Sequence, residues 1–534
     1  MTDLKQTRFI SILFFALALL TACWFRFSQL GLKPFHHDEG VNAYFLMPLM
    51  KQGSAAYKYN PLNYHGPTLY YITWAAVKLF GETDFALRFW QCAFGVLLIV
   101  LLWWFRDHLG DVGLPVAAFA IAVSPALVFF SRYFIHEMMF GFCSLAMAVA
   151  AWQYARSKHF GWMILLSVST GWLFATKETA IITVFTMLFA LLLASLWDVS
   201  RTLLREKRWT PAALVKQLRG DWAGVRPSMD HALSGFIIFV FIFVFFYSSA
   251  FTNWPGVTDA FKSIAHWTEE RSSTDHVHAR RYYLGILFKY DLPLLIGGLL
   301  AGLLIVWRGT RFWLFIGAWT FGLTLAYSLI PYKTPWLMVS FMVPLCLVCG
   351  YAAEQIYQLL TRLPLRILWL GILGVALLGA WRLCAEVNFE KYADNGNSAG
   401  YFREFMKARG YTPYVDGQYG FVYAQTDKDF HAFIQTLQRT ADSYPEQKAT
   451  GIYLASNEYW PLPWYMRNYS GVAFTGSLPA KLDEASVTQP IMIAKADQRT
   501  AIEEAGGWRL VERPFTMRPG VELLIYQRER GEKK

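Results

Sequence analysis

Long apolar blocks separated by short polar connections fill the chain up to about residue 384. Each block is close to the length that the hydrocarbon core of a bilayer requires. Because no water reaches that core, a spanning segment must satisfy its backbone hydrogen bonds internally, which favours helices. The pattern predicts about eleven transmembrane helices, at residues 9–29, 86–105, 112–130, 137–155, 160–176, 178–197, 234–252, 291–307, 311–330, 336–357 and 366–383.

The pattern changes from about residue 385, where charged residues become frequent and the apolar runs become short. Short β-rich runs at residues 451–455, 490–494 and 522–526 alternate with helical patterns at 399–409, 429–441 and 498–505. Such alternation is typical of an α/β domain. We therefore expect a polytopic α-helical membrane protein with a transmembrane domain over residues 1–384 and a soluble α/β domain over residues 385–534.

Composition supports a lipid environment and excludes several other classes. Hydrophobic residues make up 55% of the 534 residues and charged residues only 16%, well below the usual share in soluble proteins. The net charge of +11 is spread over the connections between apolar blocks, whereas a nucleic-acid partner requires basic residues on one polar surface. The six cysteines lie in or beside apolar segments, so neither a disulfide framework nor a zinc site is expected.

The short connections indicate an orientation in the membrane. Those at residues 106–111, 156–159, 308–311 and 361–366 each contain Arg or Lys, and these residues are enriched in connections on the cytoplasmic side. An odd number of spans then puts the C-terminal domain on the opposite, outer side.

Adjacent carboxylates follow the first predicted helix, at Asp38 and Glu39, and the two histidines before them are His36 and His37. Two interpretations stay open for this group. One carboxylate could act as a general base or a metal ligand while its neighbour is held by a cation. Alternatively, the group is a polar loop in which Asp38 caps the following helix.

Further charged residues lie on the same predicted side, at the ends of other helices. Arg132 and Glu137 precede one helix, Lys177 and Glu178 lie between two others, and Lys333 precedes a fourth. The cations could hold a phosphate while a carboxylate takes a proton from an attacking hydroxyl, which fits a lipid-phosphate substrate. The alternative for Arg132 and Glu137 is a structural ion pair.

Three motifs carry a family resemblance. Asp38-Glu39, Tyr64-His65-Gly66-Pro67-Thr68 and the run from Phe80 to Arg88 resemble the opening signature of GT-C membrane glycosyltransferases, which include protein O-mannosyltransferases and the aminoarabinose transferase of lipid A. The similarity continues through residues 132–137 and 333–344. The aromatic run at residues 458–469 resembles a flippase-associated bacterial and archaeal subgroup.

The resemblance implies inverting transfer of a sugar from a polyprenyl-phosphate carrier to a protein, lipid or glycan at the outer membrane face. The implied localisation is the cytoplasmic (inner) membrane of a bacterium or archaeon, with the C-terminal domain periplasmic or extracellular. By the same resemblance Asp38 is the catalytic base, with Glu39 and Glu137 as supporting carboxylates. The residues implied to contact the donor phosphate or substrate are Lys333, Arg132, Lys177, Glu178, Arg88 and Tyr283.

The resemblance also raises the question of a metal. In the aminoarabinose branch, positions matching His65 and His278 hold one. Here Arg280 and Arg281 follow His278 where Pro and Trp are commoner in that branch. The chain is therefore expected to need no cofactor, or else a divalent metal ion at these two histidines.

Other classes of function stay open beside the glycosyltransferase. A lipid-linked sugar transporter or flippase component would use the same charges to line a path for a headgroup. Transporters often show paired repeats and broken helices, whereas the charges here gather at helix ends. A third class is an assembly protein that uses the C-terminal domain for binding. The aromatic run at residues 458–467 fits core packing, and equally a sugar-binding or membrane-docking surface.

Overall fold

Two compact units make up the chain. The computed structural model describes residues 2–53, 57–61, 65–270, 276–392, 400–401, 420–422 and 425–529. One unit, here the helical unit, comprises Met1–Leu30, Pro48–Glu390 and Ser398–Thr412, and the other, the sheet unit, comprises Gly31–Met47, Lys391–Asn397 and Pro413–Lys534. A short N-terminal segment that carries Asp38 and Glu39 thus packs with the C-terminal part of the chain.

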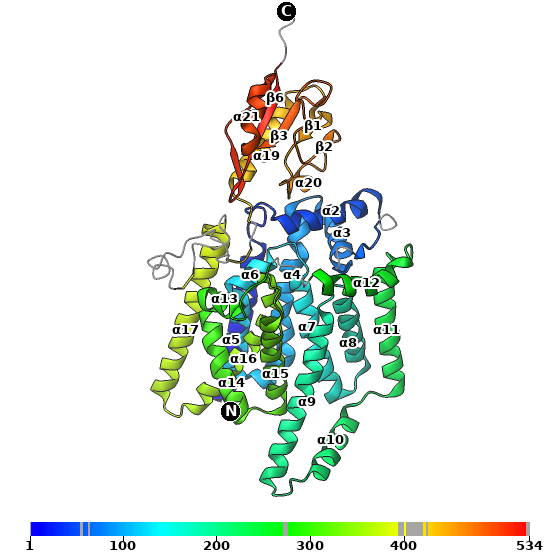
Figure 1. Ribbon diagram of the computed structural model, residues 1–534. Helices are drawn as coiled ribbons and strands as arrows, with labels where there is room; N and C mark the ends of the chain where they lie inside the picture. The colour runs from blue at the N-terminus through cyan, green and yellow to red at the C-terminus, as the bar shows by residue number, and fades with distance from the viewer. Residues whose placement is uncertain are drawn as a thin grey trace, which may run out of the picture. The chain divides into compact units, whose positions relative to one another are not determined.

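The helical unit is a bundle of long apolar helices (Figure 1). Its principal helices are α1 (Thr2–Phe27), α3 (Thr68–Phe80), α4 (Asp84–Leu102), α5 (Arg106–Val123), α6 (Pro125–Ser131), α7 (Glu137–Ser157), α8 (Phe160–Phe174) and α9 (Ala180–Arg205). They are followed by α10 (Pro211–Val225), α11 (Met229–Tyr247), α12 (Pro255–Glu270), α13 (Tyr282–Tyr290), α14 (Leu292–Arg308), α15 (Arg311–Leu329), α16 (Val339–Leu359) and α17 (Leu363–Ala385). The short helices η3 (Trp103–Phe105), η4 (Pro335–Met338) and η5 (Glu386–Glu390) extend α4, α16 and α17.

The predicted membrane spans appear as helices. Among the described residues, eight helical segments are long and apolar enough to cross a bilayer, and a ninth counts if α13 and α14, bent by 116°, form one broken span. One of the eight, Asp84–Val123, has 40 residues, about twice what one crossing needs, and is interrupted by η3 and by the non-helical Gly110. Counting that segment as two crossings and adding the short apolar α8 gives the eleven that the sequence predicts.

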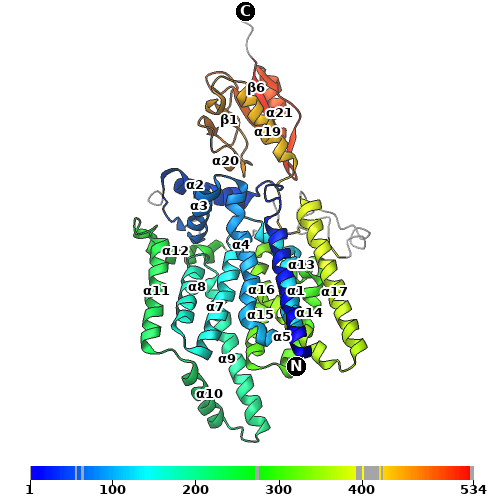
Figure 2. The same ribbon diagram turned by 180° about the vertical axis from the view of Figure 1, so that it is seen from behind.

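The two ends of the helical unit are distinct (Figures 1 and 2). The N-terminus and α10 lie at one end, here the α10 end, while α3, α12 and α13 lie at the other, here the α3 end. Polar contacts join the connections at the α10 end: Arg311 donates to Asp221 at 2.8 Å, and Lys158 donates to the carbonyl of Arg226 at 3.2 Å. The connections around Glu137 and Lys177 meet at the α3 end, as described below.

A buried arginine holds a break between α5 and α6. Arg26 is fully buried and donates to the last carbonyls of α5, those of Ile121 at 2.8 Å and Ala122 at 3.2 Å, and to Ser131 Oγ at 3.1 Å. A guanidinium at a helix C-terminus is favoured because the terminal carbonyls carry partial negative charge. Ser124 begins α6 by accepting from the Leu127 amide at 3.2 Å. The break therefore directs the chain into the Arg132–Glu137 segment.

The sheet unit is built on one mixed sheet of six strands. The strands are β1 (Ile452–Leu454), β2 (Val472–Phe474), β3 (Ile491–Lys495), β4 (Trp508–Leu510), β5 (Phe515–Arg518) and β6 (Val521–Arg528). Their order is β2-β1-β3-β6-β4, with β5 also paired to β6; β1 pairs in parallel with β2 and β3, and β6 runs antiparallel to its neighbours.

Among the described residues of the sheet unit, three α-helices accompany the strands: α19 (Asp429–Asp442), α20 (Leu462–Tyr465) and α21 (Arg499–Ala505). The amphipathic α19 buries Phe430, Phe433 and Leu437 in one core with strand residues such as Ile493. The α/β character predicted for this region is therefore confirmed, and the three predicted strands and two of its predicted helices appear close to their expected positions. The third predicted helix, at residues 399–409, lies outside the described residues except for 400–401.

Candidate functional site

A tight turn before α3 packs against the connection between α8 and α9. The Gly66 amide donates to the Thr176 carbonyl at 3.0 Å, and the hydroxyls of Thr68 and Thr176 lie 2.9 Å apart. A Cβ at Gly66 would overlap the backbone carbonyl of Ala175, so only glycine fits here without a shift. The His-Gly-Pro-Thr motif thus brings residue 65 beside residues 177 and 178.

A buried ion pair joins α7 to the same connection. Lys177 Nζ lies 2.5 Å from Glu137 Oε1, and each side chain is 5% exposed. Burial lowers the pKa of Lys177, but the carboxylates of Glu137 and Glu178 outweigh burial and raise the pKa above its usual value. Lys177 is therefore charged, and its charge is compensated inside the bundle.

A second carboxylate is paired beside the first. Glu178 Oε2 lies 3.1 Å from His65 Nδ1, and the His65 ring lies 4.8 Å from that of His136. Burial raises the pKa of Glu178, yet His65 and Lys177 together hold it below its usual value. His136 donates from Nε2 to the Gly66 carbonyl at 3.3 Å, and burial together with the nearby His65 and Lys177 charges holds its pKa well below the usual range. We call these five residues, His65, His136, Glu137, Lys177 and Glu178, the paired cluster.

Two arginines predicted to contact substrate hold the end of α1. Arg132 donates to the carbonyls of Phe25 at 2.8 Å, Ser28 at 2.6 Å and Gln29 at 3.1 Å, and stacks over the Phe389 ring. Arg88 is buried and donates to the Leu30 carbonyl at 2.5 Å. The predicted alternative of an ion pair between Arg132 and Glu137 is wrong. Glu137 pairs with Lys177, and Arg132 donates to carbonyls at the end of α1.

Lys333 and Tyr283 fix the loops at the α3 end. Lys333 Nζ donates to the carbonyls of His278 at 3.0 Å, Ile330 at 2.5 Å and Pro331 at 3.3 Å. An ammonium has three donors, so these contacts use all of them. Tyr283 is buried, and its hydroxyl donates to the Thr334 carbonyl at 3.1 Å. Both side chains therefore tie the loop before α13 to the loop before η4.

Two cations next to these loops remain exposed. Within the described part of the chain, neither Arg280 nor Arg281 makes a hydrogen bond or an ion pair. Burial and the charge of Arg280 lower the pKa of Lys333. The sequence motif marked these arginines only as a departure from the family pattern.

The two histidines considered for a metal have other contacts. His65 pairs with Glu178, and the His278 ring stacks on Tyr282 with centroids 4.3 Å apart. The residues that the structure describes contain no group of three or more His, Cys, Asp or Glu side chains that could hold a metal ion. The arrangement of these histidines thus does not fit a preformed metal centre.

The Asp38–Glu39 group begins helix α2 (His37–Gln52) in the sheet unit. The Asp38 amide donates to His36 Nδ1 at 3.2 Å, while the His36 amide donates to Glu39 Oε2 at 3.0 Å. This reciprocal arrangement is a capping box, in which the side chains at the N-cap and at the third helical position satisfy backbone donors. The helix is therefore capped by His36 and Glu39, and not by Asp38.

The two carboxylates of this group differ in exposure. Glu39 is fully buried, whereas Asp38 is half-buried in the first turn of α2. Burial and the Arg518 charge lower the pKa of His37 to about 4, so this histidine is neutral near pH 7. Of the adjacent pair, Asp38 is the carboxylate that solvent can reach.

The aromatic run of the sheet unit packs against the same segment. Phe35 stacks on Trp464 with ring centroids 5.7 Å apart, and its amide donates to the Tyr465 hydroxyl at 2.9 Å. A Cβ at Gly40 would lie 2.6 Å from Pro461 Cβ. Core packing therefore explains part of the aromatic run, since it holds the Asp38 segment in place.

Several contacts had only weak signals in the sequence. The sequence does not single out His136, which only precedes Glu137 in the chain. The ion pair between Arg518 and Glu458 joins two distant segments of the sheet unit. The pairing of Lys177 with Glu137 spans forty positions along the chain. The sequence gives residue types and spacings. Pairs of this kind depend instead on which helices and connections pack together in the folded protein.

Comparisons with known proteins give a family match over this part of the chain. Residues 64–216, which contain the paired cluster, match the family model described as dolichyl-phosphate-mannose-protein mannosyltransferase. No curated protein matches the chain in sequence.

Solved structures extend the similarity to nearly the whole chain. ArnT from Cupriavidus metallidurans, bound to undecaprenyl phosphate, matches with a TM-score of 0.64 and 17% identity, covering 96% of this chain and 97% of ArnT. Its apo state matches with a TM-score of 0.61 and 17% identity over the same shares. AglB from Archaeoglobus fulgidus, in complex with an inhibitory peptide and a dolichol-phosphate, matches with a TM-score of 0.50 and 11% identity, covering 93% of this chain and 70% of AglB. The predicted similarity to GT-C membrane glycosyltransferases is thus confirmed in fold.

Proposed function

We propose that the chain is an inverting GT-C glycosyltransferase that moves a sugar from a polyprenyl-phosphate-linked donor to an acceptor hydroxyl of a protein, lipid or glycan. The observation that carries this proposal is the fold shared along 96% of the chain with ArnT, a protein solved with undecaprenyl phosphate bound. The family match over residues 64–216 supports the same class.

Asp38 acts as the general base in this proposal. Its carboxylate accepts the proton of the acceptor hydroxyl, whose oxygen forms a bond to the anomeric carbon of the donor sugar. The bond between that carbon and the phosphate oxygen breaks, and its electron pair leaves with the polyprenyl phosphate. A single displacement of this kind inverts the anomeric configuration. The half-buried position of Asp38, beside a buried and engaged Glu39, supports this choice of base.

The donor phosphate is held by Arg280 and Arg281. Both are exposed and make no hydrogen bond within the described residues, whereas Lys333 has its three donors on carbonyls. Lys333, predicted from the sequence to touch the phosphate, then acts by fixing the loop that carries the arginines. Replacing both arginines by Gln should raise the KM for the lipid donor with a smaller change in kcat, because the lost contacts serve binding.

The remaining predicted residues position this machinery. Arg88 and Arg132 fix the end of α1, and Tyr283 fixes the loop before α13. Glu137, Lys177 and Glu178 form a compensated group at the start of α7 and α9 and support the α3 end. Such compensation keeps charged side chains stable at the mouth of a membrane bundle.

The proposed location is the cytoplasmic membrane of a bacterium or archaeon, with the α3 end and the C-terminal domain on the periplasmic or extracellular side. The basic connections gathered at the α10 end support it through the positive-inside rule. Labelling of single cysteines placed at the exposed positions 159 and 258, in a variant without the six native cysteines, tests it with a membrane-impermeant reagent, since only the cysteine at residue 258 in α12 should react in intact cells.

Loss of the gene product from its own cell tests the function as a whole. Mass spectrometry of that strain should find a polyprenyl-phosphate sugar accumulating while one glycan, glycoprotein or glycolipid loses a sugar. Purified protein should then transfer that sugar in detergent, and chelation of divalent ions should leave the rate unchanged. If lipid export failed in that strain and the purified protein transferred no sugar, the result would instead support a transporter or flippase component.

A further inference from the structure

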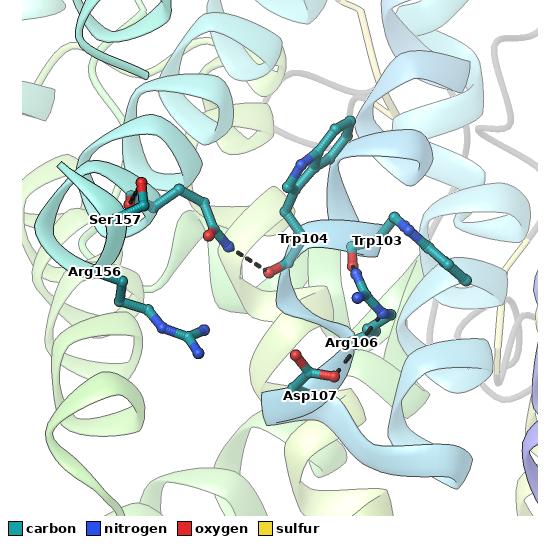
Figure 3. Close-up of a pocket in the computed structure, with 7 residues that line it drawn as sticks. Trp103, Trp104, Arg106, Asp107, Arg156 and Ser157 are labelled. Carbon is teal, nitrogen blue, oxygen red and sulfur yellow. Dashed lines mark hydrogen bonds and ion pairs between the residues drawn. The ribbon is translucent and has the colours of Figure 1, made fainter. Parts of the chain in front are cut away.

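We propose that a pocket at the α10 end of the helical unit binds the phosphate of an anionic glycerophospholipid. The pocket has a volume of about 560 Å³ and lies where α4 ends and α7 ends (Figure 3). Its lining residues are Trp103, Trp104, Arg106, Asp107, Gln153, Arg156 and Ser157. None of them belongs to the transfer machinery proposed above, and the pocket's ligand does not depend on that proposal.

The position of the pocket along the membrane-spanning helices indicates that its ligand is a lipid headgroup. Helix α4 carries no charge from Phe89 to Leu102, and α7 carries none between Glu137 and Arg156. Arg106, Asp107 and Arg156 are thus the first charged side chains beyond two membrane-spanning stretches. Charged residues at that position lie at the level of the headgroups, and tryptophans such as Trp103 and Trp104 are enriched there.

The charge of the pocket favours an anion. Arg156 makes no hydrogen bond or ion pair with any residue that the structure describes, and its guanidinium reaches toward the space opposite Arg106 and Asp107 (Figure 3). Asp107 lies 3.9 Å from Arg106, beyond hydrogen-bond distance, so two cations face one anion. The buried Nε of Arg106 has no hydrogen-bond partner, which leaves a donor for a phosphate oxygen.

The lining is held in place before any ligand binds. The Arg106 guanidinium lies 4.7 Å from the Trp103 ring centroid and donates from Nη1 to the Trp103 carbonyl at 2.8 Å. Gln153 donates from Nε2 to the Trp104 carbonyl at 2.9 Å, which ties α7 to η3. Fixed donors lose less entropy on binding, so a phosphate gains more from them. A lipid here would join the end of α4 to the end of α7.

Lipid titration of the purified full-length protein tests this site. Native mass spectrometry in detergent should show phosphatidylglycerol retained and phosphatidylcholine lost. R106Q/R156Q should bind phosphatidylglycerol about thirty-fold more weakly, because the variant loses the contributions of two basic residues to the binding free energy of an anionic lipid. R156Q alone should weaken binding less, and R156K should keep most of it. R362Q, which removes an exposed arginine at residue 362 outside the pocket, is the matched control and should bind like the original protein.

Thermal unfolding gives an independent measurement for any variant that folds poorly. Phosphatidylglycerol should raise the Tm of the original protein and of R362Q, raise that of R156Q less, and raise that of R106Q/R156Q least, because a ligand stabilises the native state in proportion to how tightly it binds. Equal binding of phosphatidylcholine, or unchanged phosphatidylglycerol binding by R156Q, would overturn the proposal. So would saturation of the site by glycerol 3-phosphate with no lipid retained, which would identify a soluble phosphate ligand.

Discussion

The paired cluster of the helical unit and the Asp38 segment of the sheet unit stabilise their buried carboxylates in different ways. Both keep carboxylates in poorly hydrated surroundings. The paired cluster compensates Glu137 with Lys177 and Glu178 with His65, at the start of α7 and in two connections of one bundle. The Asp38 segment instead buries one carboxylate, Glu39, as a helix cap and is held by aromatic contacts such as Phe35 on Trp464.

This difference indicates which carboxylate can act as a general base. Glu137 Oε1 lies 2.5 Å from Lys177 Nζ, so this carboxylate is already engaged in a buried ion pair. Glu39 is occupied by the His36 amide. Asp38 is half-buried in the first turn of α2, so its carboxylate is the more accessible of the adjacent pair.

Breaking the ion pair of the paired cluster should have the largest effect on stability. K177M leaves a buried carboxylate without its cation, which should lower the free energy of unfolding by about 3–5 kcal/mol. E137Q should have a comparable cost, while E137Q/K177M should cost less than the sum of the two, because no charge is then left uncompensated. Denaturant unfolding in detergent measures all three. Additive losses would show that the two residues do not act as a pair.

Adding a methyl group at Gly66 should disturb the same cluster through its backbone. The methyl group would overlap the Ala175 carbonyl, and overpacking of this kind costs about 1–3 kcal/mol. G66A should lower the Tm and the transfer rate together. G371A is the matched control, because a Cβ at this helical glycine meets nothing within 4 Å. An unchanged Tm for G66A would contradict the close approach of the two connections.

The corresponding change in the Asp38 segment is G40A. Its Cβ would lie 2.6 Å from Pro461 Cβ and 2.7 Å from Pro461 Cα, so the segment must shift against the aromatic run. We expect a loss of about 1–2 kcal/mol together with reduced transfer, because the turn that holds Asp38 moves. Limited proteolysis should show faster cleavage near residue 40 in G40A. Transfer at the original rate would show that this contact does not position Asp38.

Acidification should destabilise the protein modestly through its buried histidines. The pKa of His136 lies well below 6.5, so below about pH 6.5 the unfolded chain binds a proton that the folded chain does not. Stability is then complete above pH 6.5 and falls by about 1 kcal/mol per histidine toward pH 5.5. H136N should flatten the dependence of Tm on pH, whereas H159N, at an exposed histidine, should leave it unchanged. An identical pH profile for H136N would show that His136 is not buried in its neutral form.

Sequence alone predicts the helices well and the pairings poorly. Each span is a local property, since about twenty apolar residues identify it without reference to the rest of the chain. The partner of Glu137 depends on how α7 packs against α8 and the connection that follows it, and the nearest cation in the chain, Arg132, is not that partner. Likewise, nothing local distinguishes Asp38 from Glu39, because the difference arises from the capping box and from burial.

The division of the chain shows the same limit. Composition places a change near residue 385, and the domains 1–384 and 385–534 stay a prediction. Packing assigns Gly31–Met47 to the sheet unit, which composition gives no reason to expect. The contacts responsible, such as Thr426 to the Phe35 carbonyl at 2.7 Å, join residues almost four hundred positions apart.

The most direct test of the account compares purified D38N and E39Q in transfer from a polyprenyl-phosphate-linked sugar. D38N should lose transfer by about 100- to 10,000-fold while its Tm and lipid binding stay unchanged, because it removes a general base and no structural contact of the capping box. E39Q should instead lower the Tm and retain more activity. Transfer by D38N at the rate of the original protein would contradict the central claim.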